Sequence, residues 1–207
     1  MNLTYREAGP GDAAALADVG GKTFVETFVH LYDARDLAAF MRIHTAESWT
    51  TELADPELGI MLVEEEGRPV AYAKVGPRSL PYRPDGPAME LRQFYVLKPW
   101  QGAGIAPRLM DWVLAQARAR GAGEICLSVW SENERAKRFY ARYGFGYVGP
   151  YKFMVGEQAD EDEIWRLNLA APTGRHPELV SGSSSPPPPS LSWHARKHVQ
   201  GNERANS

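Results

Sequence analysis

Hydrophobic and polar positions repeat along the chain with two different periods, and each period predicts one kind of element. Alternation at every second residue, rich in β-branched and aromatic side chains, predicts strands. Apolar positions three and four residues apart, following residues that suit a helix N-cap, predict helices. The expected strands cover residues 3–6, 59–64, 69–75, 89–97, 124–129, 145–155 and 163–169. The expected helices begin near residues 12, 33, 45, 105 and 131.

Short polar segments predict the connections between these elements. Glu66-Gly67 predicts a tight turn between two antiparallel strands, and Asp160-Glu161-Asp162 predicts an acidic turn between the last two strands. Ser131 and Glu134 have the spacing of a capping box for the last helix, and Asp12 is placed to cap the first. Helices that interrupt a largely antiparallel set of strands predict an α+β (mixed α/β) fold and exclude a doubly wound repeat.

The last 37 residues differ in composition from the rest of the chain. They contain six prolines, seven serines and three glycines, but only five large apolar residues. So little apolar surface cannot offset the entropy cost of ordering the segment. We therefore expect one domain at residues 1–170 and a disordered Pro/Ser-rich tail at residues 171–207. The tail carries a net charge of +2, so residues 1–170 carry −5 of the whole-chain charge of −3.

Composition and charge exclude several classes of protein. The chain has 207 residues, 43% of them hydrophobic, which is enough for a substantial core. It has no basic excess, which argues against nucleic acid as a partner. It has no apolar run of the ~18 residues that a membrane span needs, and residues 1–12 do not read as a signal peptide. The single cysteine, Cys126, favours a reducing, cytoplasmic location, and scattered tail histidines predict no metal site.

The most informative segment is residues 94–106, in which a strand leads through a turn of small residues into a helix. Such a turn presents backbone N–H groups at the positive end of a helix, where a phosphate or pyrophosphate binds well. The alternative is a helix start whose small residues serve close packing only. A P-loop is excluded because no Gly-Lys-Ser/Thr follows. A dinucleotide fingerprint needs Gly or Ala where this chain has Pro107.

The remaining pattern, Gln-x-x-Gly-x-Ala at residues 101–106, resembles the acetyl-CoA pyrophosphate loop of the GNAT family of N-acetyltransferases. Residues 95–101 are similar to the strand-to-loop signature of that family. Residues 133–145 (Asn-x-x-Ala-x-x-Phe-Tyr-x-x-Tyr-Gly-Phe) are similar to its pantetheine-contacting segment. Residues 27–32, together with Glu90-Leu91, look like GNATs of the bacterial polyamine-acetylating type. The likeness covers about residues 3–169.

The resemblance implies a fold and a cosubstrate. The expected fold is a mixed, mostly antiparallel sheet of about six to seven strands flanked by helices. A splayed strand pair in that sheet would hold acetyl-CoA. Small residues in the loop would bring its amides to the pyrophosphate, although Pro107 supplies no N–H. The residues expected to bind acetyl-CoA are Phe94, Tyr95, Val96, Gln101, Gly102, Ala103, Gly104, Ile105, Ala106, Asn133 and Tyr140.

The resemblance also implies two catalytic residues. Tyr140 stands where a tyrosine of the family protonates the leaving thiolate; alternatively, it packs against Phe139 and Tyr143. Glu90 stands where some members carry a glutamate that takes a proton from the amine, directly or through water. Alternatively, Glu90 pairs with an arginine on the surface.

The acceptor is expected to be a primary amine of a small cationic molecule or a peptide, since an acidic body attracts cations. We expect Glu26, Tyr32 and Tyr82 to contact it. The enzyme would act as a monomer or homodimer. A non-catalytic acyl-CoA-binding sensor on the same fold is the alternative function.

Overall fold

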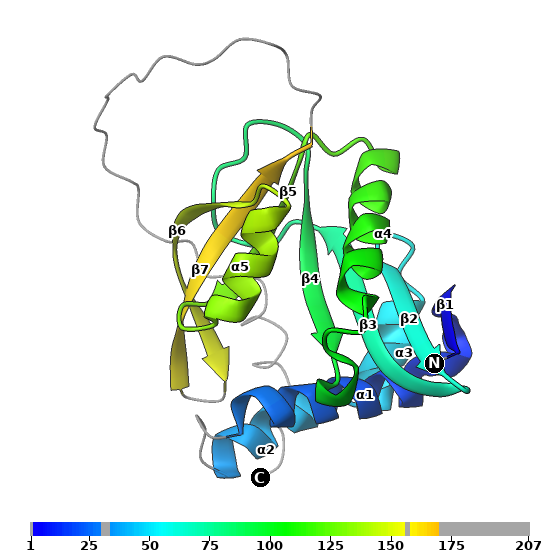
Figure 1. The fold of residues 1–207 in the computed structure, drawn as a ribbon. Coiled ribbons are helices and arrows are strands. Elements are labelled where there is room, and N and C mark those ends of the chain that lie inside the picture. Colours follow the sequence, from blue (N-terminus) through cyan, green and yellow to red (C-terminus); the bar gives the residue numbers. More distant parts are fainter. Residues whose placement is uncertain (1, 30–33, 156–157, 170–207) are drawn as a thin grey trace, which may run out of the picture.

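A single seven-stranded sheet organises the protein, in the order β1-β2-β3-β4-β5-β7-β6 (Figure 1). The computed structural model describes residues 2–29, 34–155 and 158–169. The strands are β1 (Leu3–Glu7), β2 (Gly59–Glu65), β3 (Arg68–Pro77), β4 (Ala88–Val96), β5 (Glu124–Trp130), β6 (Gly146–Val155) and β7 (Gln158–Asn168). The helices are α1 (Ala13–Phe28), α2 (Ala34–Ile43), α3 (Ala46–Leu53), α4 (Ile105–Ala119) and α5 (Glu134–Arg142), with short 3-10 turns η1 (Pro10–Asp12) and η2 (Lys98–Trp100).

Strand pairing is antiparallel throughout except between β4 and β5. These two parallel strands pair over only three residues each, 88–90 with 124–126. Beyond that point β4 and β5 diverge, and the ribbon shows the gap that opens between them (Figure 1). The predicted α+β class, the mostly antiparallel sheet and the splayed strand pair are confirmed.

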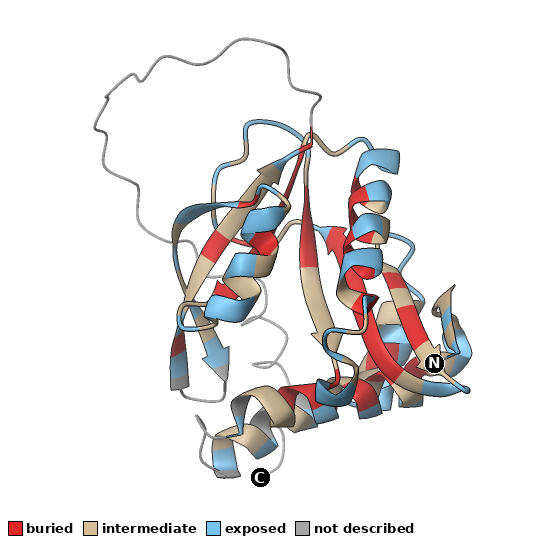
Figure 2. Ribbon diagram, viewed as in Figure 1, coloured by how far each residue is buried: buried red, intermediate tan, exposed pale blue. Residues whose placement is uncertain are grey.

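Helices cover both faces of the sheet and build two hydrophobic clusters. On one face, Leu109 and Val113 of α4 are fully buried against residues of β3, β4 and β5. On the other face, Leu16 of α1 and Trp49 of α3 pack against Tyr72 of β3. Figure 2 shows the buried residues concentrated in the central strands and on the inner sides of α1 and α4. The sheet is therefore supported from both sides up to the edge of the gap.

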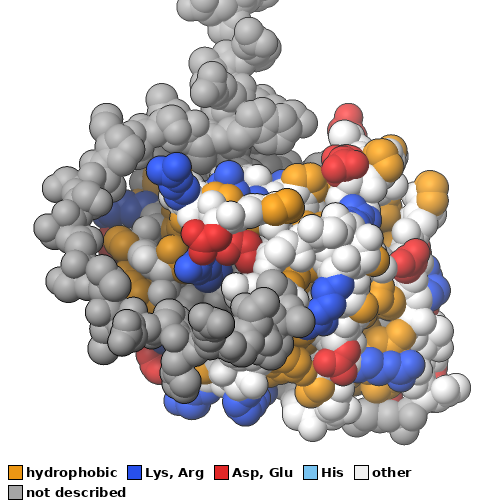
Figure 3. Space-filling view, turned by 90° about the horizontal axis from the view of Figure 1, so that it is seen from above, with side chains coloured by type: hydrophobic (Ala, Val, Ile, Leu, Met, Phe, Trp, Pro, Cys, Tyr) orange, Lys and Arg blue, Asp and Glu red, His pale blue; other side chains and the backbone are white. Residues whose placement is uncertain are grey.

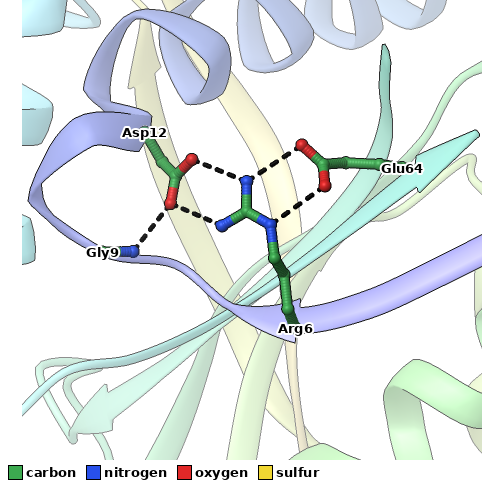
Figure 4. Close-up of polar contacts among 4 residues, drawn as sticks. All are labelled: Arg6, Gly9, Asp12 and Glu64. Carbon is green, nitrogen blue, oxygen red and sulfur yellow. Dashed lines mark hydrogen bonds and ion pairs between the residues drawn. The ribbon is translucent and has the colours of Figure 1, made fainter. Parts of the chain in front are cut away.

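One ion network fixes the start of the chain to the sheet (Figure 4). The Arg6 guanidinium donates to both oxygens of Asp12, at 2.7 and 2.8 Å, and to both oxygens of Glu64, each at 2.9 Å. Asp12 also accepts from the N–H of Gly9 at 2.7 Å. Asp12 is the N-cap residue of α1, as expected, but its carboxylate serves Arg6 and Gly9 rather than the helix amides.

The acidic turn expected at residues 160–162 is not a turn. These residues lie inside β7, which begins at Gln158 and pairs with β6 on one side and with β5 on the other. Pairing on both edges supplies backbone hydrogen bonds that override the weak strand preference of Asp and Glu. Along the strand, the side chains therefore alternate between the two faces of the sheet.

The capping box expected at Ser131 and Glu134 is also wrong. The N-cap of α5 is Asn133, whose side chain accepts from the N–H of Ala136 at 3.1 Å. Asparagine is as good an N-cap as serine, and here it stands directly before the first helical residue.

Several charged side chains form ion pairs. Arg166, for example, donates to Asp85 at 2.8 Å and to Glu124 at 3.1 Å. On the face seen from above, acidic and basic side chains stand among hydrophobic ones (Figure 3). Within the described ranges, no helix is long and apolar enough to cross a bilayer. The expected tail, 171–207, lies outside these ranges.

Candidate active site

The gap between β4 and β5 is the centre of the candidate site. The last paired residues are Glu90 and Cys126, although β4 continues to Val96 and β5 to Trp130. Among the described residues, the edge of β4 that faces β5 therefore has no strand partner over its second half. Such an edge offers backbone N–H and C=O groups to an extended ligand.

A bulge in β4 decides which side chains face the gap from each side. Lys74 pairs with Gln93 and Val75 with Leu91, so Arg92 is an extra residue without an opposite neighbour. One extra residue reverses the alternation of side chains, which brings Glu90 and Tyr95 onto the same face. That face is the one covered by α1 and α3, since Tyr95 packs edge-on against Tyr72 with ring centroids 5.5 Å apart.

The predicted pyrophosphate loop leads directly into α4. Gly102 has a φ of 88° and Gly104, the N-cap of α4, has a φ of 78°. L side chains rarely adopt this left-handed region, so glycine suits both positions. A Cβ built at either glycine would meet no described residue other than its chain neighbours within 4 Å, so neither position is crowded.

Two of the amides expected to bind the cofactor close turns of the loop itself. The N–H of Gln101 donates to Lys98 at 3.1 Å, and the N–H of Ala103 donates to Trp100 at 3.3 Å. The amides of Gly104, Ile105 and Ala106 belong to the start of α4, where N–H groups have no intrahelical partner. Gln101 instead braces the loop through its side chain, which donates to the carbonyl of Val96 at 2.9 Å and accepts from Arg135.

Helix α5 borders the other side of the gap and supplies polar and basic groups. The Oδ1 of Asn133 caps the helix, which leaves the Nδ2 of the same amide as a donor toward the cleft. Arg135, Arg138 and Arg142 of α5 also line the cleft. These guanidinium groups stand on the same side as the loop at the start of α4, so this part of the cleft suits an anionic ligand.

Tyr140 lies at the inner end of α5 within an aromatic cluster. Its ring centroid is 5.5 Å from that of Phe139, 5.7 Å from that of Phe145 and 6.3 Å from that of Phe94. Burial raises the pKa of Tyr140 above its usual value, and an electrostatic interaction with Tyr95 adds to the rise. The phenol is therefore protonated at neutral pH. Tyr140 also lines the cleft, so its packing and its contact with the cleft coexist.

Glu90 lines the cleft as well, but one of its oxygens is fully engaged. Its Oε2 accepts from the N–H of Ser79 at 2.6 Å, from the hydroxyl of Ser79 at 2.8 Å and from the N–H of Leu80 at 3.1 Å. The residue is 7% exposed. Instead of an arginine, Glu90 binds the loop that follows β3.

The residues expected to contact the acceptor are only partly brought together. Glu26 lines the cleft, and its Oε2 accepts from the N–H of Lys98 at 3.0 Å. Tyr82 is not among the lining residues; its hydroxyl donates to Glu124 at 2.9 Å, and the ring packs beside Leu80 and Cys126. Tyr32 lies outside the described residues.

Two acidic residues that the sequence analysis left in a turn line the cleft. Asp160 and Asp162 lie two residues apart on β7, so both side chains are on one face. Burial raises the pKa of Asp162 to about 7, the negative charges of Asp160 and Glu163 add to the rise, and a hydrogen bond with Ser128 opposes it. Residues 160–163 are all acidic, so no alternation of polar and apolar residues marked this part of the chain as a strand.

The loop, the gap and these acidic residues line one continuous cleft of about 1820 Å³. Pockets for a single small ligand are usually about 300–1,000 Å³, so this cleft has room for two ligands together. Among the described residues, no three His, Cys, Asp or Glu side chains gather closely enough to hold a metal ion.

Comparison with known proteins identifies the family. The profile of the "Acetyltransferase (GNAT) family" matches residues 24–145. A protein of Mycobacterium tuberculosis named as an uncharacterized N-acetyltransferase is 33% identical over 154 residues, which cover 74% of this chain and 95% of that protein. The chain belongs to the GNAT acetyltransferase family.

Solved structures share the fold. The PaiA N-acetyltransferase of Thermoplasma acidophilum, determined in complex with coenzyme A, aligns with a TM-score of 0.66 at 16% identity, covering 81% of this chain and 99% of that one. The yncA protein of Salmonella typhimurium, determined with its cofactor acetyl-CoA, aligns with a TM-score of 0.56 at 19% identity, covering 89% and 100%. The expectation of an N-acetyltransferase of the GNAT fold is thus confirmed at the level of the family.

Proposed function

We propose that this protein transfers the acetyl group of acetyl-CoA to a primary amine of a small cationic, polyamine-like molecule or of a peptide. The observation that carries the proposal is the continuity of one cleft. It joins the amides at the start of α4, the unpaired edge of β4 and the buried phenol of Tyr140. Two relatives of the same fold were solved with coenzyme A or acetyl-CoA, which supports the choice of cosubstrate.

The cosubstrate would bind along the gap. Its pyrophosphate would accept hydrogen bonds from the amides of Gly104, Ile105 and Ala106, with the positive end of α4 behind them. Its pantetheine arm would continue the sheet along β4 at Phe94–Val96 and meet the side-chain amide of Asn133. This path brings the thioester to Tyr140, at the point where the strands separate.

The reaction would be a direct attack by the amine on the thioester, without an acyl-enzyme. Backbone N–H groups of the unpaired part of β4 would stabilise the negative charge that forms on the carbonyl oxygen. Tyr140, which carries its proton at neutral pH, would give it to the departing thiolate. For the proton on the amine, Glu90 remains a candidate acceptor through its Oε1 or through a water molecule.

Charge near the thioester supports a cationic acceptor. Three cations that line this part of the cleft already have partners: Lys74 pairs with Glu52 at 2.5 Å, Lys152 with Glu161 at 3.0 Å, and Arg92 donates to the carbonyl of Pro77 at 2.8 Å. The lining carboxylates of Glu90 and Asp162 add negative charge to this part of the cleft, which would attract an ammonium group. We further propose a reducing, cytoplasmic location, since Cys126 is a buried free thiol.

A titration and an activity assay on the full chain test the proposal. Calorimetry should detect acetyl-CoA binding, and a panel of diamines, polyamines and short peptides should include an amine that releases free thiol from acetyl-CoA. Binding without turnover by any amine would favour the sensor function instead. No binding of acetyl-CoA would overturn the proposal.

A further inference from the structure

Strand β7 brings an acidic side chain to the cleft that the family resemblance did not mark. Asp162 lies opposite Trp130 of β5 and opposite Tyr151 of β6. Its side chain shares a face with Asp160, and both line the cleft together with Tyr95 and Glu90. Glu161, between the two aspartates, points to the other face and pairs with Lys152 at 3.0 Å.

The groups around Asp162 come from four strands. Ser128 of β5 forms a hydrogen bond with its carboxylate, and Asp160 and Glu163 of β7 place negative charge beside it. The negative charge of Asp162 raises the pKa of two phenols, Tyr95 of β4 and Tyr151 of β6. The charge of Glu90 also raises the pKa of Tyr151, so this phenol lies near both carboxylates. Each of these neighbours is an acid or a neutral hydroxyl.

We infer that Asp162 receives the proton of the acceptor ammonium group, which makes it a catalytic residue of the reaction proposed above; the inference rests on that proposed function. Asp162 lines the same cleft as Tyr140, and among the described residues its carboxylate has one side-chain hydrogen-bond partner, Ser128. Glu90 has three donors on a single oxygen, which tie it to the loop after β3. Asp162 is therefore freer than Glu90 to bind the ammonium hydrogen.

Protonation behaviour agrees with this geometry. A general base works best when its pKa is close to the working pH. Burial raises the pKa of Asp162 to about 7, with further increases from Asp160 and Glu163, so the carboxylate can both hold and release a proton near neutral pH. The ionised form attracts the cation and can take its proton.

The proton balance of the step is complete. The ammonium group gives one hydrogen to Asp162, and the resulting neutral amine forms the C–N bond as the C–S bond breaks. As the intermediate collapses, Tyr140 gives its proton to the departing thiolate, and the second proton lost from nitrogen restores the phenol of Tyr140. The third hydrogen stays on the amide, and Asp162 returns its proton to solvent.

The test is the dependence of kcat/KM on pH for the most active amine of the panel. The wild-type profile should rise with pH through an inflection near pH 7, as Asp162 ionises. In Asp162→Asn the inflection should disappear, and kcat/KM at pH 7.5 should fall by roughly 10²-fold or more. Asp18→Asn, which removes an exposed carboxylate outside the cleft, should keep the wild-type profile. An Asp162→Asn profile that keeps the inflection, with kcat/KM within twofold of wild type, would overturn the inference.

Two further measurements keep the inference falsifiable. Ser128→Ala removes a hydrogen bond that stabilises the ionised carboxylate, so the inflection should move upward, by roughly half a pH unit to one unit. An inflection that does not move in Ser128→Ala would contradict the assignment of the base to Asp162. So would an inflection that disappears in Glu90→Gln but remains in Asp162→Asn. Calorimetric titration of Asp162→Asn with acetyl-CoA should match wild type. If the wild-type protein itself bound no acetyl-CoA, the proposed function would fail first, and the inference with it.

Discussion

Glu90 and Cys126 are the last residues at which β4 and β5 pair, and the whole candidate site follows from the separation of the strands beyond them. The break leaves a free edge along the second half of β4. It also lets a side chain of α5, Tyr140, interact electrostatically with Tyr95, which faces the other side of the sheet. A fully paired sheet would have closed this passage.

Tyr140→Phe tests the proposed acid. The substitution keeps the ring in its aromatic cluster and removes only the proton donor, so kcat should fall by roughly 10²-fold. Acetyl-CoA affinity by calorimetry should change less than twofold. Tyr143→Phe is the matched control. Tyr143 is the C-cap residue of α5, and its hydroxyl donates to the carbonyl of Pro107 at 3.3 Å, so the substitution also removes one phenol hydroxyl from this region. If both variants kept wild-type kcat, Tyr140 would have only a packing role.

Gly104→Ala tests the loop. At a φ of 78°, a Cβ costs roughly 1–2 kcal/mol of backbone strain, so the loop should shift and its amides should leave their positions. We expect acetyl-CoA affinity to fall about tenfold in a calorimetric titration. Gly86→Ala controls for the loss of a surface glycine, because a Cβ there also meets nothing within 4 Å. Equal affinities for the two variants would contradict the assignment of the pyrophosphate site.

Pro107→Ala should strengthen cofactor binding. Pro107 is the third residue of α4 and has no N–H, so alanine adds one donor to the group of amides at the helix start. One additional hydrogen bond contributes about 0.5–1 kcal/mol, which is a two- to fivefold lower Kd for acetyl-CoA. The measurement is the same titration, and a weaker affinity would place the pyrophosphate elsewhere.

The Arg6–Asp12 pair should make stability depend on pH. The hydrogen bond from Arg6 is the largest cause that lowers the pKa of Asp12 below its usual value, so the ionised form stabilises the fold. That contribution is complete above the usual pKa of about 4 and is lost as the pH falls through the lower pKa of the folded state.

Asp12→Asn should therefore reduce the free energy of unfolding at pH 7 by about 0.5–1.5 kcal/mol. The effect is small because solvent screens the Arg6–Asp12 pair. The difference from wild type should shrink as the pH falls from 4 to 2. Urea unfolding of both proteins at several pH values measures this difference in the free energy of unfolding. Asp18→Asn removes an exposed pair with Lys22 and should have little effect at any pH. A deficit in Asp12→Asn that stays constant with pH would contradict this explanation.

The parts of the site that the sequence could predict are those that depend on neighbours along the chain. The glycines of the loop and the start of α4 follow from a local pattern, and so does the placement of Asn133 and Tyr140 at opposite ends of one short helix. Local rules of turn and helix formation decide these features. For the same reason most strands and helices were predicted within a few residues of their observed bounds.

The parts that the sequence could not predict depend on pairing between distant strands. Asp162 belongs to a strand because β5 and β6 bind both of its edges, and nothing within residues 160–162 indicates that. Likewise, the extra residue at Arg92, which turns Glu90 and Tyr95 to one face, becomes evident only from the register with β3. The carboxylate proposed as the base therefore lay in a segment for which the sequence predicted a turn.

The most direct measurement is mass spectrometry of the amine after incubation of the full chain with acetyl-CoA that carries a 13C-labelled acetyl group. We predict that a cationic primary amine gains one labelled acetyl group on nitrogen, in an amount equal to the free thiol released, and that Tyr140→Phe slows both roughly 10²-fold. Thiol release without a labelled amine, or no release with any amine of the panel, would contradict the account.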